Sequence, residues 1–164
     1  MVDFVELVET ESRGLVAAVY AIVGDQHRSE EIVQETFERC YRRWRRVSRL
    51  DKPGAWARRV AINEAISTNR KRHSEQQALQ RLNVLTARPA APDPLAALDD
   101  EGVWAAVRRL PTEQAAVIAL RYGADLSVEE IAETMGLSIP AAKSLLHRGR
   151  NALRGSAEMQ SYAE

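Results

Sequence analysis

The chain has 164 residues, of which 28% are charged and 45% are hydrophobic, and its formal net charge is zero. These values are typical of a soluble globular protein with one ordinary domain or two small ones. No apolar run approaches the ~20 residues of a membrane span, and the acidic start excludes a secretory signal, so we expect a cytoplasmic protein with no membrane insertion. The single cysteine, Cys40, excludes an intrachain disulfide and is expected to be a small buried hydrophobe.

The zero net charge conceals an uneven distribution along the chain. Residues 1–38 carry nine Asp or Glu against two Arg, whereas residues 39–72 carry two acids against twelve Arg or Lys. Residues 138–154 again hold bases and no acid, namely Lys143, Arg148, Arg150 and Arg154. This alternation predicts contact with a polyanion at two separated places.

Two amphipathic helices are predicted first, at residues 2–23 and 29–46. Gly24 and Asp25 end the first helix, and Ser29 is expected to cap the second. The acids of the second helix come early and its bases late, which complements the helix dipole. Its acidic face is interpreted either as a protein-docking surface or as a solvated face. That face contains Glu31, Gln34 and Glu35, and the buried stripe is predicted to contain Ile32, Val33, Phe37, Cys40, Tyr41 and Trp44.

A connecting loop is predicted at residues 47–54, followed by a third helix from about residue 55 to residue 72 or beyond. The cations of this loop and helix can neutralise phosphates, and the nearby aromatic rings could receive an unstacked base. The alternative is that each aromatic residue simply belongs to the core, which we favour, so only the group of bases is assigned a function. The polar face of the helix contains Arg58, Arg59, Asn63, Arg70 and Arg72.

Three prolines between residues 86 and 94 predict an interdomain linker. Beyond it, residues 95–110 and 112–122 predict two helices that are separated by Pro111, the first with Val103 and Val107 in its apolar stripe. The predicted fold class is therefore all-α, with two small helical domains joined by a Pro-containing linker. The domains are predicted at residues 1–85 and 95–164, with the linker at residues 86–94.

A helix-turn-helix is predicted at residues 126–154. Ser127 and Glu130 have the spacing of a capping box, Gly136 permits a sharp turn, and Ser138 precedes the second helix as its N-cap. A basic second helix suits the major groove of DNA, although a three-helix packing module with a solvated basic face is the alternative. The second helix is predicted to bury Ala142, Leu146 and Leu153 and to project Lys143, Ser144, His147, Arg148 and Asn151.

Three ordered blocks of the chain resemble the extracytoplasmic-function sigma factors of the sigma-70 family. They are RSEEIVQETF at residues 28–37, KPGAW at 52–56 with VAIN at 60–63, and LP at 110–111 through LRY at 120–122 with LSVEEIA at 126–132. The resemblance covers both predicted domains, and the frequent Ala, Arg and Val are typical of a high-GC actinobacterial source.

The resemblance implies three functional surfaces. The first binds core RNA polymerase, through its beta and beta-prime subunits, with Glu31, Gln34, Glu35 and Phe37. The second opens the minus-ten promoter element with Arg58, Arg59, Asn63, Arg70 and Arg72, together with the loop at residues 47–53. The third reads the minus-thirty-five element of promoter DNA with Ala141, Lys143, Ser144, His147 and Arg148. The resemblance also makes an anti-sigma factor a plausible regulatory partner.

The chain departs from the family pattern at the start of the recognition helix. Residues 140–145 read PAAKSL where relatives commonly have GTVKSR, and Ala115 stands where many relatives have Arg. These changes remove polar or cationic groups, so we expect an altered promoter preference and one weaker phosphate contact.

No enzyme, cofactor, metal site or catalytic residue is predicted. The sequence has no phosphate-binding glycine loop, no metal-ligand cluster and no nucleophile with a base, and its three histidines are scattered. The predicted function is an alternative sigma factor that gives RNA polymerase promoter specificity. Two rivals remain: a free-standing helix-turn-helix regulator that needs no polymerase, and a protein-sequestering module with little salt-dependent affinity for DNA.

Overall fold

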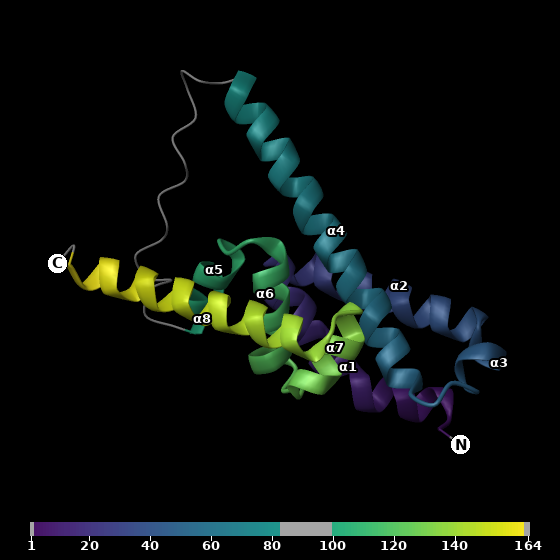
Figure 1. The fold of residues 1–164 in the computed structure, drawn as a ribbon. Helices are drawn as coiled ribbons and strands as arrows, with labels where there is room; N and C mark the ends of the chain where they lie inside the picture. Colours follow the sequence, from purple (N-terminus) through teal and green to yellow (C-terminus); the bar gives the residue numbers. More distant parts are fainter. Residues whose placement is uncertain (1, 83–99, 163–164) are drawn as a thin grey trace.

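A computed structural model describes residues 2–82 and 100–162, and every regular element within these ranges is a helix (Figure 1). The all-α fold class is therefore confirmed. The predicted linker at residues 86–94 and the first residues of the helix predicted to follow it lie outside the described residues. Residues 2–82 are called the N-terminal half below, and residues 100–162 the C-terminal half.

Helices α1 (Phe4–Val23) and α2 (Gln26–Arg42) are joined by a tight turn at Gly24, whose φ of 75° favours glycine. Asp25 caps α2, because its carboxylate accepts the Arg28 N–H at 3.0 Å. The prediction that Ser29 caps this helix is wrong. Ser29 is buried in the first turn, where its hydroxyl donates to the Asp25 carbonyl at 2.6 Å.

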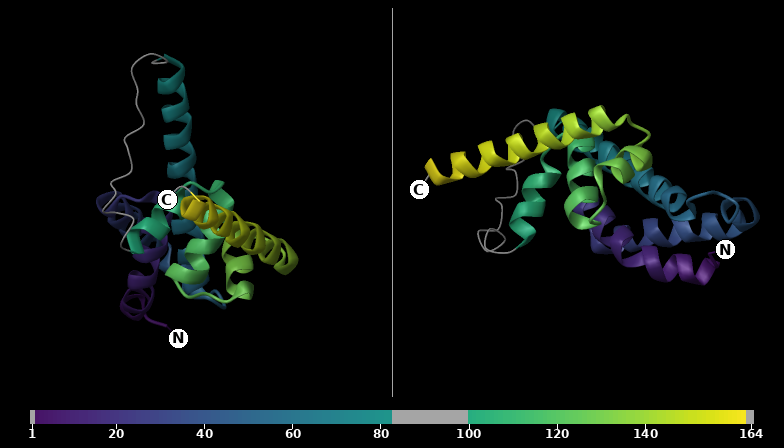
Figure 2. Two further views of the ribbon diagram at one scale, coloured as in Figure 1. Left: turned by 90° about the vertical axis from the view of Figure 1, so that its left-hand side faces the viewer. Right: turned by 60° about the horizontal axis from the view of Figure 1, so that its bottom comes forward.

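Helices α3 (Trp44–Val47) and α4 (Pro53–Leu82) complete the N-terminal half. The single helix predicted for residues 29–46 is interrupted at Arg43, whose φ is −108°. The third predicted helix begins at Pro53 and continues to Leu82, and its final segment, residues 73–82, is exposed at every position. This arm extends away from the other described helices (Figures 1 and 2), so it needs no apolar stripe, and its Glu, Gln, Ala and Leu residues are strong helix formers.

The C-terminal half begins with α5 (Asp100–Arg108) and α6 (Thr112–Ile118), which continues into the π-helix η2 (Ala119–Gly123). The predicted break at Pro111 is confirmed. Helices α7 (Val128–Met135) and α8 (Ile139–Tyr162) follow and form the predicted helix-turn-helix.

One hydrophobic cluster joins the two halves. It contains Leu15, Ile22 and Ile62 of the N-terminal half and Val117 and Ile131 of the C-terminal half, each at most 1% exposed. Helix α1 packs against α2 and α4 on its own side and against α5, α6 and η2 from the other half, while α4 packs against α6 and α7. The two family-like segments therefore lie against each other in a closed arrangement.

The structure confirms the predicted burial of Ile32, Val33 and Phe37 but contradicts that of Tyr41 and Val103. Tyr41 is 66% exposed, because it lies beyond the core at the end of α2, with its ring edge-on to Phe4 at 5.2 Å between centroids. Val103 is 59% exposed, because α5 turns Trp104 and Val107 toward the core instead. Cys40 is fully buried as predicted, and this burial raises the pKa of its thiol to about 11.

Among the described helices, none combines the length and the apolar character needed to cross a membrane.

Candidate nucleic-acid interface

The turn between α7 and α8 is built by local hydrogen bonds. The Glu130 N–H donates to Ser127 Oγ at 3.1 Å, and the Ser127 N–H donates to Glu130 Oε2 at 2.8 Å, which confirms the capping box. Gly136 has a φ of 66°, and Ser138 Oγ accepts the Ala141 N–H at 3.2 Å as the N-cap of α8.

The carboxylate of Glu130 is held in its charged form. Its pKa is lowered chiefly by the hydrogen bond from the Ser127 backbone, while partial burial works in the opposite direction. The acid is therefore ionised at neutral pH and accepts the Ser127 N–H in its charged form.

Helix α8 separates an inner face from an outer face as predicted. Ala142 and Leu146 are buried, and Leu153 is partly buried. The outer face has no carboxylate between residues 138 and 154, and local bonds order it, since Arg148 donates to Ser144 Oγ at 3.1 Å. Of the five candidates for base or phosphate contact, Lys143, Ser144, His147 and Arg148 are exposed and Ala141 is partly buried.

Helix α4 carries the second group of candidates, and the structure divides them. Arg58 is largely buried and forms an ion pair with Glu11 of α1 at 2.7 Å, and Arg72 donates to the Val23 carbonyl at the end of α1 at 2.8 Å. Asn63 is exposed. Arg59 and Arg70 are also exposed, but both bind the C-terminal half: Arg59 donates to the Glu133 carbonyl at 2.6 Å, and Arg70 pairs with Glu113 at 2.8 Å.

A cluster of exposed arginines lies on α3 and in the following loop. Arg45 and Arg46 were missed as candidate residues, whereas Arg49 belongs to the loop predicted at residues 47–53. Arg45, Arg46, Arg49 and Leu50 line a hollow of about 450 Å³. The signal was present in the sequence, because residues 42–49 hold five arginines and no acid, yet an Arg-rich helix end is equally explained by the helix dipole. Guanidinium groups arranged in this way can bind phosphate oxygens.

The acidic face of α2 contains the predicted docking residues. Gln34 and Glu35 are exposed, Glu31 is partly exposed, and Phe37 is buried beneath them. Arg28 lies among the acids, 3.2 Å from Glu31 and 3.9 Å from Glu35, so part of the negative charge is already compensated within the chain.

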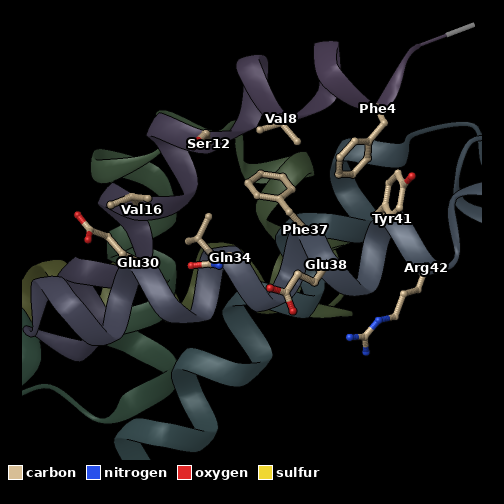
Figure 3. Close-up of a pocket in the computed structure, with 11 residues that line it drawn as sticks. Phe4, Val8, Ser12, Val16, Glu30, Gln34, Phe37, Glu38, Tyr41 and Arg42 are labelled. Carbon is tan, nitrogen blue, oxygen red and sulfur yellow. The ribbon is translucent and has the colours of Figure 1, made fainter.

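Beside this face, α1 and α2 form an open apolar groove of about 700 Å³ (Figure 3). Its walls are apolar, and Gln34, Glu30, Glu38 and Arg42 stand at its edges. Sequence reasoning missed the groove because it assigned the apolar residues of both helices to the core. The apolar residues lining it are Phe4, Val8, Val16, Val33, Phe37 and Tyr41.

Two stretches of the chain match models of known protein families. Residues 7–75 match the model of "Sigma-70 region 2", and residues 100–153 match that of "Sigma-70, region 4". The chain is 27% identical over 162 residues to the ECF RNA polymerase sigma factor SigW of Bacillus subtilis, covering 92% of this chain and 87% of that protein. It is 29% identical to the RNA polymerase sigma-E factor of Streptomyces coelicolor, covering 94% of this chain and 85% of that protein.

Solved structures show the same fold. The sigma factor RpoE from Bartonella quintana, crystallised with the anti-sigma factor NepR, superposes with a TM-score of 0.71 at 24% identity and covers 95% of this chain and 97% of that chain. CnrH, in complex with the cytosolic domain of CnrY, superposes with a TM-score of 0.66 at 22% identity and covers 95% of this chain and 88% of that chain. The two matched regions, which lie in the order of the family and together span most of the chain, show that the chain belongs to the sigma-70 family, and its similarity to SigW is to a member of the extracytoplasmic-function group of that family.

Proposed function

We propose that this protein is an alternative sigma factor that directs core RNA polymerase to a defined set of promoters. The observation that carries the proposal is the outer face of α8, which is exposed, free of carboxylates and held at a fixed angle by a capped turn. A helix with these properties can enter the major groove and contact both base edges and phosphates. The proposal places this step at the minus-thirty-five element.

The second step of the proposal is capture of one strand of the minus-ten element. The proposal assigns this step to the exposed residues Asn63, Arg59 and Arg70 of α4, together with the exposed arginines on α3 and the following loop. Unstacking a base costs a few kcal/mol, and binding energy on the separated strand can offset that cost without nucleotide hydrolysis. The proposed activity is therefore recognition and melting, with no catalytic step, and the proposed place of action is the cytoplasm.

Core RNA polymerase is the partner proposed for α2. An exposed polar face with Gln34 and Glu35, next to an apolar groove, suits a partner that presents a helix with apolar and basic side chains. An anti-sigma factor is the second partner proposed for this groove, since the structural relative RpoE was crystallised with the anti-sigma factor NepR.

Run-off transcription from a promoter library tests the proposal. Core polymerase is supplied with the wild-type protein, with a Gln34→Ala, Glu35→Ala double variant, or with a Glu9→Ala, Thr10→Ala double variant. The last changes one acid and one polar residue at exposed positions of α1 outside the groove lining. We expect defined transcripts with the wild type and the α1 variant and a strong loss with the α2 variant.

The other outcomes identify the rivals. If no transcripts appear and the protein alone retards duplex DNA, the protein is a free-standing regulator. If it neither supports transcription nor binds DNA, the protein-sequestering module is the better description.

A further inference from the structure

We infer that the first turn of α8 reads the C5-methyl group of thymine in the minus-thirty-five element. The three residues concerned, Ile139, Pro140 and Ala141, are called the apolar turn below. The inference rests on the proposed function, because it takes the entry of α8 into the major groove as given, and it adds the base and the chemical group that this helix selects.

The apolar turn lies on the outer face of α8. Ile139 is 41% exposed, Pro140 is exposed and Ala141 is partly buried. Pro140 shares its face with Ser144 and His147, since residues four and seven positions further on lie on the same side of a helix. Ile139 and Ala141 flank Pro140. The helix therefore presents apolar atoms at the end that meets base edges when a recognition helix docks in the major groove.

The backbone of the apolar turn is poorly suited to a phosphate. A helix N-terminus binds an anion through N–H groups that have no partner within the helix. Pro140 has no N–H, and the Ala141 N–H donates to Ser138 Oγ at 3.2 Å. The Ala142 N–H donates to the Ser138 carbonyl at 3.0 Å. These positions therefore offer DNA no N–H donor, and the turn is left with apolar contact.

Thymine is the base that suits apolar contact in the major groove. Its C5-methyl group is the apolar group that a base pair presents there, and apolar side chains contact it. The edges of guanine, adenine and cytosine present hydrogen-bonding groups instead, which an apolar side chain would leave unpaired. Burial of the methyl group against the apolar turn therefore favours thymine over the other bases.

The neighbouring side chains favour DNA over a protein as the occupant of this face. Lys143 and Arg148 are exposed beyond the apolar turn, and residues 138–154 contain no carboxylate. Ser144 Oγ accepts a hydrogen bond from Arg148 at 3.1 Å, so the Ser144 hydroxyl proton is left to donate to a base. Because lysine pairs with guanine O6 and N7, the face predicts thymine close to bases with acceptors in the major groove.

Base substitution within a selected element tests the inference. Holoenzyme, formed from core polymerase and the full chain, is used to enrich duplexes from a promoter library randomised at the minus-thirty-five region. Each thymine of the enriched element is then replaced in turn by deoxyuridine, which lacks only the C5-methyl group. Competition for the holoenzyme compares the affinity of each substituted duplex with that of the unsubstituted one.

Two protein variants separate the apolar turn from other effects. The turn variant is Ile139→Ala, Pro140→Ala, which removes apolar atoms without adding a charge. The control is Leu79→Ala, Leu82→Ala, which removes apolar atoms from side chains that are 57% and 82% exposed on α4. Circular dichroism checks that both variants keep their helices.

We expect deoxyuridine at one or more of these thymines to lower the affinity of the wild type and of the control by roughly two- to fivefold, the effect of burying one methyl group. The turn variant should lose this discrimination, because atoms that contact the methyl group are gone. The comparison of the two duplexes with the wild type alone is informative even if the turn variant fails to fold.

The inference is overturned if the enriched element contains no thymine, or if deoxyuridine leaves the wild-type affinity unchanged at every thymine. It is also overturned if a folded turn variant discriminates between the duplexes as strongly as the control does. A holoenzyme that enriches no element at all contradicts the proposed function, and the inference with it. An enriched element that is insensitive to the methyl group removes the inference and leaves the proposed function standing.

Discussion

Arg58 and Glu11 show how a residue that resembles a DNA contact can also hold the fold together. Their side chains are 12% and 17% exposed and 2.7 Å apart, and they join α4 to α1. We expect Arg58→Ala to lower the free energy of unfolding by about 1–3 kcal/mol, because it leaves the Glu11 carboxylate buried without its partner. Urea denaturation measures this loss.

The control for that variant is Arg59→Ala. Because Arg59 is exposed, Arg59→Ala should lower the free energy of unfolding by less than about 1 kcal/mol in the same assay. Equal losses for the two variants would show that the buried pair has no special role. Gly54→Ala offers a second check, because its Cβ would lie 2.5 Å from the Glu11 carboxylate and would push that group away from Arg58.

Cys40 is expected to resist thiol reagents. Burial raises its pKa to about 11 from the ordinary value of 9.0, so at pH 8 the folded protein contains about a hundredfold less thiolate than the unfolded chain. Alkylation with iodoacetamide should therefore be at least that much slower in buffer than in denaturant. Comparable rates would mean that the packing around α2 opens readily.

The capping box of α7 should stabilise the protein in a way that depends on pH. The Ser127 hydrogen bond lowers the folded-state pKa of Glu130 below 4.5, so the unfolded chain binds this proton more readily. The stabilisation is present above the unfolded-state pKa and is lost as the pH falls through the folded-state pKa. Glu130→Gln should lower the free energy of unfolding by roughly 0.5–1 kcal/mol at pH 7, and by progressively less as the pH falls through the folded-state pKa of Glu130.

Thermal or urea unfolding at several pH values tests that dependence, with Glu129→Gln as the control on the exposed side of the same turn. A cost for Glu130→Gln that stays constant from pH 7 to pH 3 would contradict the role of the carboxylate. The Ser127 hydroxyl also stabilises the helix, so Ser127→Ala should lower the free energy of unfolding by about 1 kcal/mol.

The cations on the outer face of α8 should make the affinity for DNA depend on salt concentration. Lys143 is exposed on the outer face, so Lys143→Ala should weaken binding to duplex promoter DNA and reduce the slope of log affinity against log salt by about one. Asn151→Ala removes an exposed polar group from the same helix and should leave the slope unchanged. Filter binding over a salt series compares the two, and equal slopes for wild type and Lys143→Ala would exclude a phosphate contact.

The features that the sequence predicted well are those that depend on residues close together in the chain. The capping box, the glycine turn and the buried residues of α8 each depend on side chains within a few positions, so their patterns were readable. The end of α4 and the exposure of Tyr41 depend on which helices are absent beside them. Hydrophobic spacing alone cannot distinguish the lining of a groove from the lining of a core.

At the scale of the whole molecule, the family-like segments were readable from sequence and their closure was not. The helices of each half have apolar stripes, but a stripe does not show whether the helix packed against it belongs to the same half or to the other one. The cations of α4 and the acids at Glu113 and Glu133 are more than forty positions apart, and no local pattern links them. Closure thus became visible only through tertiary contacts.

The seam between α1 and η2 provides a test of closure that is independent of charge. A Cβ at Gly123 would lie 3.7 Å from the Trp104 ring and 3.8 Å from the backbone of Ala17 and Ala18, which is ordinary contact, so Gly123→Ala should keep the halves together. Gly123→Leu adds atoms for which this seam has no space, and overpacking typically costs about 1–3 kcal/mol. We expect this cost to favour separation of the halves, which the radius of gyration measures.

Small-angle scattering then gives the decisive comparison. We expect a larger radius of gyration for Gly123→Leu than for Gly123→Ala, with equal helical content by circular dichroism. Combining Gly123→Leu with Glu133→Lys should open the chain further, since one change acts where α1 meets η2 and the other removes the ion pair between Glu133 and Lys52. If both glycine variants remain as compact as the wild type, the seam adjusts locally and closure does not depend on the close approach of α1 and η2.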